Sequence, residues 1–199
     1  MVVIDILPLG SYQTNCYIVR EAASTACAVI DPGYEPKTIL SHLRGKGLSA
    51  EAILLTHGHF DHVGAVRPLA EAAGCPVYLC EEELSLPPRM TDGPLYYTNA
   101  YGDGDALELA GLTFRVLHTP GHTPGSVCLV AEDALFSGDT LFAGSCGRVD
   151  FPGSSAADMR RSLARLANLE NDYSVYPGHG CASTLRKEQQ YNPYLKGLL

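Results

Sequence analysis

The chain has 199 residues, 46% of them hydrophobic and 18% charged, which is typical of one well-filled globular domain and excludes a disordered or low-complexity protein. Its net charge of −8, without any block of Lys and Arg, argues against a nucleic acid as partner, because an acidic surface repels a phosphate backbone. No apolar run approaches the roughly 18 residues that cross a membrane, and the first ten residues lack the basic region of a signal peptide.

The first half of the chain alternates between strand-like and helix-like runs. Three strands are expected within residues 1–30, a helix at 36–47, a strand at 52–56, a helix at 63–74 and a strand at 76–80. Pro36 favours a helix start, because a first helical turn tolerates its missing N–H group. Residues 81–105 are irregular, and we favour a surface loop over a mobile flap, with Tyr96, Tyr97 and Tyr101 as candidate pocket walls.

The second half contains strand pairs and two helical segments. Strand pairs are expected at residues 105–119 and 126–139, followed by a helix at 155–169, a strand at 173–177 and a helical tail from Thr184. Hairpin-like groups of strands, separated by single helices, predict two sheets covered by helices, a fold of the α/β (α+β) class. Seven cysteines without a CxxC pair favour reduced thiols, several of them buried in strands, and hence a cytoplasmic protein without a membrane partner.

The stretch THGHFDH, residues 56–62, contains three of the seven histidines. His57 and His59 directly follow an apolar run, so their imidazoles point to the same side if the backbone is extended there. Asp61 and His62 belong to the turn into the next helix and can face a second position. This is not the HExxH spacing, which needs a helix to align its histidines.

Three further candidate ligands also follow apolar runs: His122 in TPGHTPGS, Asp139 in FSGDT and His179 in YPGHG. Ligands gathered at strand ends from distant segments build a rigid metal site. The number of ligands fits two ions, with His57, His59 and His122 on one, Asp61, His62 and His179 on the other, and Asp139 shared. The alternative interpretation is a surface histidine cluster with unrelated polar turn residues.

The donor types indicate which metal this site binds. Imidazole with carboxylate suits zinc or iron and contains too much nitrogen for calcium or magnesium. We therefore expect two divalent ions, zinc first, with iron or a mixed Zn/Fe pair as alternatives. Three protein ligands per ion leave positions for water, as catalysis requires. His118 is expected in a supporting role, and His42 on a solvated helix face.

In this order, the motifs THGHFDH, TPGHTPGS, GDTLF and PGHG resemble those of the metallo-β-lactamase superfamily. The resemblance implies a four-layer αβ/βα sandwich with a dinuclear site at one edge, between the two sheets. GSCGRVDFPG (residues 144–153) and the tail EQQYNPYL resemble the glyoxalase II group, closest to its short bacterial members that are similar to hydroxyacylglutathione hydrolase. Glyoxalase II itself has a further C-terminal helical domain that binds glutathione. Since the chain stops at Leu199, we expect a single domain, residues 1–199, without it.

This resemblance implies a hydrolase that cleaves a small-molecule thioester, such as a hydroxyacylglutathione, by attack of a metal-bound hydroxide. Asp61 and Asp139 would act through that metal-bound water, and a thiolate, with a pKa of roughly 8.5, leaves without a strong general acid. Cys146, Gly147 and Arg148 would line the thiol-bearing end of the substrate, with Arg148 pairing with a carboxylate or only fixing its own loop.

Two rival functions stay open. The GRVDF element also resembles the persulfide dioxygenase branch, in which one iron would be held by His57, His122 and Asp139. The second rival is a metal-binding protein without turnover, which the open metal positions argue against. The lack of a secretory signal argues against β-lactamase activity. We expect a monomer or a homodimer.

Overall fold

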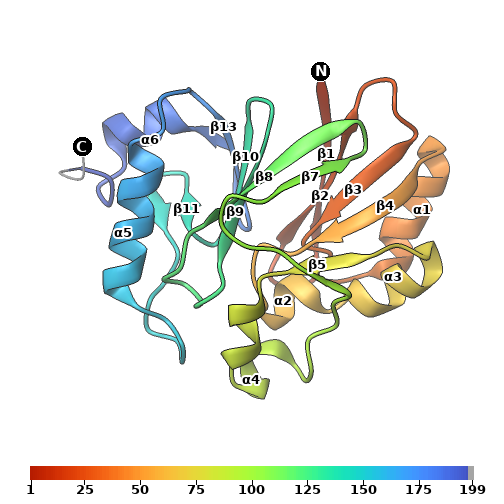
Figure 1. Cartoon of the computed structure of the whole chain (residues 1–199), viewed down its shortest axis with the longest axis horizontal. Coiled ribbons are helices and arrows are strands. Elements are labelled where there is room, and N and C mark those ends of the chain that lie inside the picture. The colour runs from red at the N-terminus through yellow and green to blue at the C-terminus, as the bar shows by residue number, and fades with distance from the viewer. Residues whose placement is uncertain (197–199) are drawn as a thin grey trace.

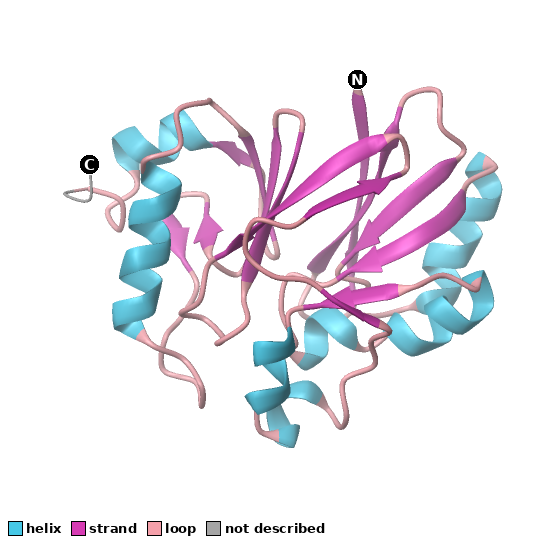
Figure 2. Cartoon of the chain, in the orientation of Figure 1, coloured by secondary structure: helices cyan, strands magenta, loops and turns pink. Residues whose placement is uncertain are grey.

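Residues 1–196 are described by the structure, a computed structural model, and they form four layers (Figure 1). Two β-sheets lie face to face in the centre, and helices cover the outer face of each, as the colouring in Figure 2 makes clear. The predicted αβ/βα sandwich is therefore confirmed.

The first sheet combines an antiparallel and a parallel half. Its order is β1 (Val2–Leu9), β2 (Thr14–Glu21), β3 (Ala26–Ile30), β4 (Ser49–Leu54), β5 (Val77–Leu79) and β6 (Asn99–Ala100). β1, β2 and β3 pair antiparallel, whereas β3 to β6 pair parallel. The parallel strands need crossover connections, which are supplied by α1 (Pro36–Lys46) and α3 (Val66–Ala73).

The second sheet is mostly antiparallel. Its order is β14 (Ser183–Thr184), β13 (Ser174–Pro177), β10 (Ala134–Gly138), β9 (Val127–Ala131), β8 (Leu112–His118) and β7 (Ala106–Leu109). Only β10 and β13 pair parallel, and α5 (Ala156–Ala167) lies between them in the chain. α5 and α6 (Leu185–Tyr191) cover the outer face of this sheet, and a small ribbon, β11 (Leu141–Phe142) with β12 (Ser145–Cys146), lies beside them (Figure 1).

The hydrophobic pattern of the strands explains the layers. β8 alternates between buried Leu112, Phe114 and Val116 and exposed Thr113 and Arg115, as expected when one face packs on a core. β3, β9 and β10 are buried almost throughout, because helices cover their second face. The central core lies between the two sheets, and two further apolar clusters join each sheet to its helices.

The segment after β5 differs from the predicted loop. It contains a 3₁₀ helix, η1 (Glu81–Ser85), a short helix, α4 (Pro88–Thr91), and the edge strand β6. The interpretation of Tyr101 as a pocket wall is wrong, because this ring is buried in the central core and its hydroxyl donates to the carbonyl of Leu55. Within residues 1–196, no helix combines the length and apolarity that crossing a membrane requires.

Candidate metal centre

Each candidate ligand lies just past the carboxyl end of a strand. His57 and His59 follow β4 of the first sheet, and the short helix α2 (Phe60–Val63) carries Asp61 and His62. His122, Asp139 and His179 follow β8, β10 and β13 of the second sheet. The site therefore lies at one edge of the sandwich, where loops from both sheets meet.

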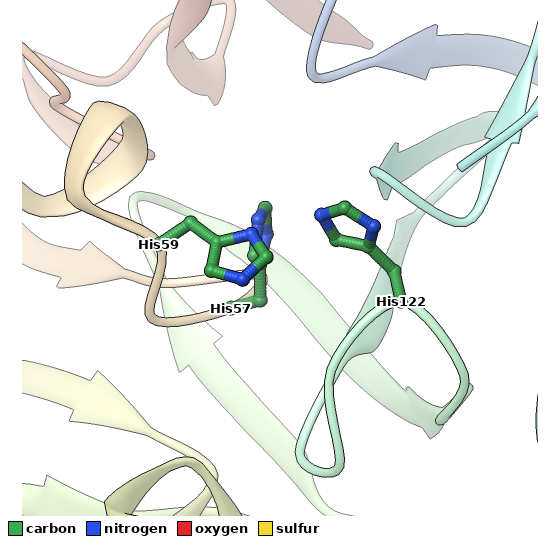
Figure 3. A group of neighbouring side chains, drawn as sticks. All are labelled: His57, His59 and His122. Carbon is green, nitrogen blue, oxygen red and sulfur yellow. The ribbon is translucent and has the colours of Figure 1, made fainter. Parts of the chain in front are cut away.

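His57, His59 and His122, here called the first histidine set, face a common point. Figure 3 shows the three rings turned toward one another, two from the loop after β4 and one from the loop after β8. One ring nitrogen from each lies within 4.8 Å of the others, and all three side chains are buried. The Nε2 atom of each ring is buried without a hydrogen-bond partner in the described chain. Such nitrogens are costly unless something binds them, so the set fits a metal ion with imidazole ligands.

The opposite ring nitrogens of His57 and His122 are held by neighbours. His122 Nδ1 lies 2.9 Å from the carbonyl oxygen of Arg148, which can only accept, so Nδ1 donates and Nε2 keeps its lone pair. Thr56 donates its hydroxyl to Asp31 at 2.6 Å, which leaves its oxygen to accept from His57 Nδ1 at 3.1 Å. Hydrogen bonds of this kind select the tautomer that a metal requires.

Burial keeps two of these imidazoles neutral. It lowers the pKa of His57 well below the usual range, and the charges of His62 and His59 lower it further. Burial, with His122 and His62, also lowers the pKa of His59 to about 3. Because a metal binds the unprotonated ring, both side chains are ready to act as ligands at neutral pH.

Asp61, His62 and His179, here called the second set, lie beside the first. Their ligand atoms are within 4.8 Å of one another, with His179 Nε2 3.2 Å from Asp61 Oδ2 and 3.4 Å from His62 Nε2. Burial raises the pKa of Asp61, but a hydrogen bond from His179 and the charge of His62 outweigh it and hold the pKa below its usual range. Asp61 is thus an ionised acceptor, better suited to bind a cation than to take up a proton.

Asp139 lies between the two sets. Its Oδ2 is 3.4 Å from His122 Nε2 and 3.6 Å from His179 Nε2, while its Oδ1 is 3.5 Å from His62 Nε2. Oδ1 is buried without a hydrogen-bond partner in residues 1–196. One carboxylate within reach of histidines from both sets has the position of a bridging ligand.

Asp31 is a functional candidate that the sequence analysis missed. It follows β3 and is 1% exposed, and it accepts from the backbone and hydroxyl of Thr56 and, at 2.9 Å, from His62 Nδ1. Burial lowers the pKa of His62, but Asp139 and Asp31 outweigh it and raise the pKa to about 9. Asp31 therefore orients His62 directly and His57 through Thr56.

A cavity of about 650 Å³ opens over the site. Its lining includes five ligand candidates, several large apolar side chains and a few other polar ones: Tyr12, His59, Phe60, Asp61, Met90, His122, Asp139, Phe142, Ser145, Cys146, Arg148, Phe151 and His179. An apolar wall with a few convergent polar groups is typical of a small-molecule site.

The three predicted substrate contacts lie at or beside this cavity. Cys146 lines the wall, and burial raises the pKa of its thiol, so it is not a reactive thiolate. A Cβ on Gly147 would come within 1.8 Å of the Asp139 carbonyl oxygen, so only glycine fits there. Arg148 donates twice to Asp150 at 2.7 Å and lies over the ring of Phe151, so its guanidinium already has partners within its own loop.

Other residues considered in the sequence lie elsewhere. His118 pairs with the carbonyl of Pro124 at 2.9 Å, near Cys80 and Glu82 and outside the two sets. His42 is not merely solvated, since it lies 3.0 Å from Asp5. Neither Tyr96 nor Tyr97 lines the cavity. Arg67 lies over the ring of Tyr96, and the hydroxyl of Tyr97 donates to Glu81.

Several known proteins resemble this chain. An uncharacterized protein of Mycobacterium leprae, ML0493, is 36% identical over 96% of this chain and 97% of its own length. Hydroxyacylglutathione hydrolase GloC of Haemophilus influenzae is 33% identical, again over 96% of this chain and 97% of its own length.

Solved structures show the same fold over nearly the whole chain. The BLEG-1 B3 metallo-beta-lactamase has a TM-score of 0.89 at 34% identity and covers 98% of this chain and 100% of its own. TTHA1623 in a di-iron-bound form has a TM-score of 0.85 at 41% identity, covering 96% and 100%. ETHE1 from Myxococcus xanthus has a TM-score of 0.85 at 28% identity, covering 98% and 85%. A family model described as the metallo-beta-lactamase superfamily matches residues 9–179, and the chain therefore belongs to this superfamily, whose members are mostly metal-dependent hydrolases.

Proposed function

We propose that this protein is a metal-dependent hydrolase that cleaves thioesters. The observation that carries the proposal is the cluster of three buried Nε2 atoms of the first histidine set, which have no hydrogen-bond partner among the described residues. They lie beside Asp139, at the floor of an open cavity. The similarity to GloC supports a hydroxyacylglutathione-like substrate.

In this proposal the first histidine set would hold one divalent ion and the second set another, and Asp139 would serve as a ligand common to both. When bound, such ions lower the pKa of a water molecule toward neutrality and polarise a carbonyl group. Zinc is the metal we propose first, and the similarity to the di-iron form of TTHA1623 supports iron as the alternative.

The chain's own residues divide the remaining work. Asp31 and the Arg148 carbonyl keep the ligand rings in the tautomer that exposes Nε2. Phe142, Phe151 and Met90 give the cavity an apolar wall. Asp61 stays ionised and so cannot act as a general acid, which favours a leaving group that departs as an anion. A thiolate does so near neutral pH, whereas an amide nitrogen does not.

Cys146, Gly147 and Arg148 remain proposed contacts for the thiol-bearing end of the substrate. To bind a substrate carboxylate, Arg148 must give up its ion pair with Asp150. The side chains of Arg148 and Asp150 are both largely exposed, so breaking this pair costs little free energy. We also propose a cytoplasmic location, which the seven free thiols support.

One experiment separates this proposal from its main rival. Purified protein is analysed for metals and assayed anaerobically with S-lactoylglutathione and, for comparison, a chromogenic β-lactam. Two zinc ions with release of free thiol and no β-lactam turnover support the thioesterase. One iron without anaerobic turnover, together with oxygen consumption on glutathione persulfide, would instead establish the dioxygenase, an alternative that the similarity to ETHE1 supports.

A further inference from the structure

Glu83 is a fully buried carboxylate close to the first histidine set. It lies in η1 and is 0% exposed, although it stands within a run of three glutamates of which Glu81 and Glu82 are at the surface. A buried carboxylate is costly unless hydrogen bonds compensate for lost hydration. Its contacts therefore indicate what it does.

The two oxygens of Glu83 bind two different ligand loops. Oε2 accepts from the backbone N–H of Gly58 at 2.5 Å, and Oε1 accepts from that of Gly125 at 2.6 Å. Gly58 separates His57 from His59 in the loop of the first sheet. Gly125 lies three residues after His122 in the loop of the second sheet. One side chain thus connects the backbones of both loops that supply the first histidine set.

Glycine at both positions leaves room for this contact. A Cβ on Gly58 would lie 3.0 Å from Glu83 Oε2 and 2.9 Å from Leu95, and a Cβ on Gly125 would lie 2.8 Å from Glu83 Cγ. Side chains at either position would therefore push the carboxylate away. The two glycines let the carboxylate reach the N–H groups directly.

The ring of His59 depends most on this support. His57 and His122 are held through Nδ1 by Thr56 and Arg148, whereas the His59 ring makes no hydrogen bond to the described residues. Its position is set by the backbone on either side, and Glu83 holds that backbone at Gly58.

We propose that Glu83 is a positioning residue for the metal ion of the first histidine set. It touches neither metal nor substrate, and it fixes the distance between the two loops whose rings must converge. Its removal widens or loosens the first set but leaves the second set, which has no ligand in the Gly125 loop, largely as it is. The inference rests on the ligand sets of the proposed function and not on the thioester reaction.

The substitution Glu83→Gln tests this role. It keeps one acceptor oxygen and replaces the other by an NH2 group. This group is a donor and would face the backbone N–H of Gly58 or Gly125, which is also a donor. We expect cobalt(II) affinity at the first histidine set to fall by at least about tenfold, with a change below about threefold at the second set. Metal-free protein is titrated with cobalt(II) against a competing chelator, and His59→Ala identifies the binding step of the first set.

Two further variants complete the test. Glu81→Gln, at an exposed position of the same helix where the side chain accepts from Tyr97, should leave every step unchanged. Gly125→Ala should reproduce the selective loss, and it provides the test if Glu83→Gln does not fold. Unchanged affinity in Glu83→Gln, or equal weakening of both steps, would overturn the role of Glu83. Unchanged binding in His59→Ala would overturn the ligand set itself, whereas absent thioesterase activity of the wild type would overturn only the proposed reaction.

Discussion

Substituting Asp31 by Asn should cost the protein much of its metal affinity, because Asp31 lies behind two of the proposed ligands, His57 and His62. The carboxylate accepts from Thr56 N at 2.7 Å, from the Thr56 hydroxyl at 2.6 Å and from His62 Nδ1 at 2.9 Å. An Asn side chain keeps only one acceptor oxygen. If this oxygen faces Thr56 N, the amide donates to the Thr56 hydroxyl and to His62.

That arrangement changes both metal ligands nearby. His62 must then accept at Nδ1 and carry its proton on Nε2, the atom that faces Asp139. The Thr56 hydroxyl must donate to His57, which moves the proton of His57 to Nε2 as well. The opposite amide orientation leaves the buried Thr56 N–H without an acceptor, at about 1–3 kcal/mol of folding stability.

The expected loss of metal affinity is about 10- to 100-fold, as is usual when a residue behind a ligand is changed. Converted to free energy at 1.36 kcal/mol per factor of ten, this is about 1.4 to 2.7 kcal/mol. The measurement is a titration of metal-free protein with zinc against a competing chelator, with thermal unfolding of the metal-free variant recorded in parallel.

Asp5→Asn is the matched control, because Asp5 pairs with His42 at 3.0 Å in a similar carboxylate–histidine contact away from the site. It should leave zinc affinity unchanged. If Asp31→Asn binds zinc as tightly as the wild type, the tautomer argument fails.

Three further predictions concern the same centre. Asp139→Ala should abolish metal-dependent activity and lower the metal content of both sets, because it removes a carboxylate that lies close to His122 of the first set and to His62 and His179 of the second. Stoichiometric metal by elemental analysis would contradict this. Gly178→Ala would place a Cβ 2.3 Å from Asp139 Oδ1 and 2.6 Å from His62 Cε1. We therefore expect weaker metal binding and a free energy of unfolding that is lower by about 1–3 kcal/mol in denaturant titrations. An unaltered unfolding transition would contradict this prediction. His62 of the metal-free protein has a pKa of about 9, above the ordinary 6.5, so its stabilising contribution is present below pH 6.5 and is lost as the pH rises through about 9. Metal must displace this proton, so zinc affinity should rise with pH up to about 9, and calorimetry in buffers of different ionisation enthalpy should detect proton release.

Much of the fold, and the choice of candidate ligands, could be predicted from local pattern. Period-two burial in strands and glycine or proline at helix ends depend on a few neighbouring residues, and these gave the two sheets and their covering helices. The ligand candidates shared one context, the end of an apolar run. Asp31 has this same context after β3 and could have been found by that rule, but its DPG sequence resembled a simple turn.

Glu83 and Tyr101 could not be predicted in this way. Nothing in EEE distinguishes Glu83 from Glu81 and Glu82, because its burial depends on backbone groups of Gly58 and Gly125, far away in the chain. Tyr101 lies in an irregular segment whose composition suggests exposure, yet the segment brings the ring back over the central core. Both outcomes are decided by tertiary packing and not by neighbours in sequence.

The spacing of the ligands along the chain has a consequence for biosynthesis. His62 and His179 bring their Nε2 atoms to 3.4 Å although 117 residues separate them. A nascent chain on the ribosome therefore cannot complete the second set until β13 has been made and has paired with β10. Ions that bind only the complete site would stabilise the folded state, in which both halves of the chain are joined. At a free metal concentration of 1,000 times Kd, the free energy of unfolding would rise by about 4 kcal/mol. Metal binding would thus stabilise only those molecules in which both halves of the second set have been synthesised and have folded together.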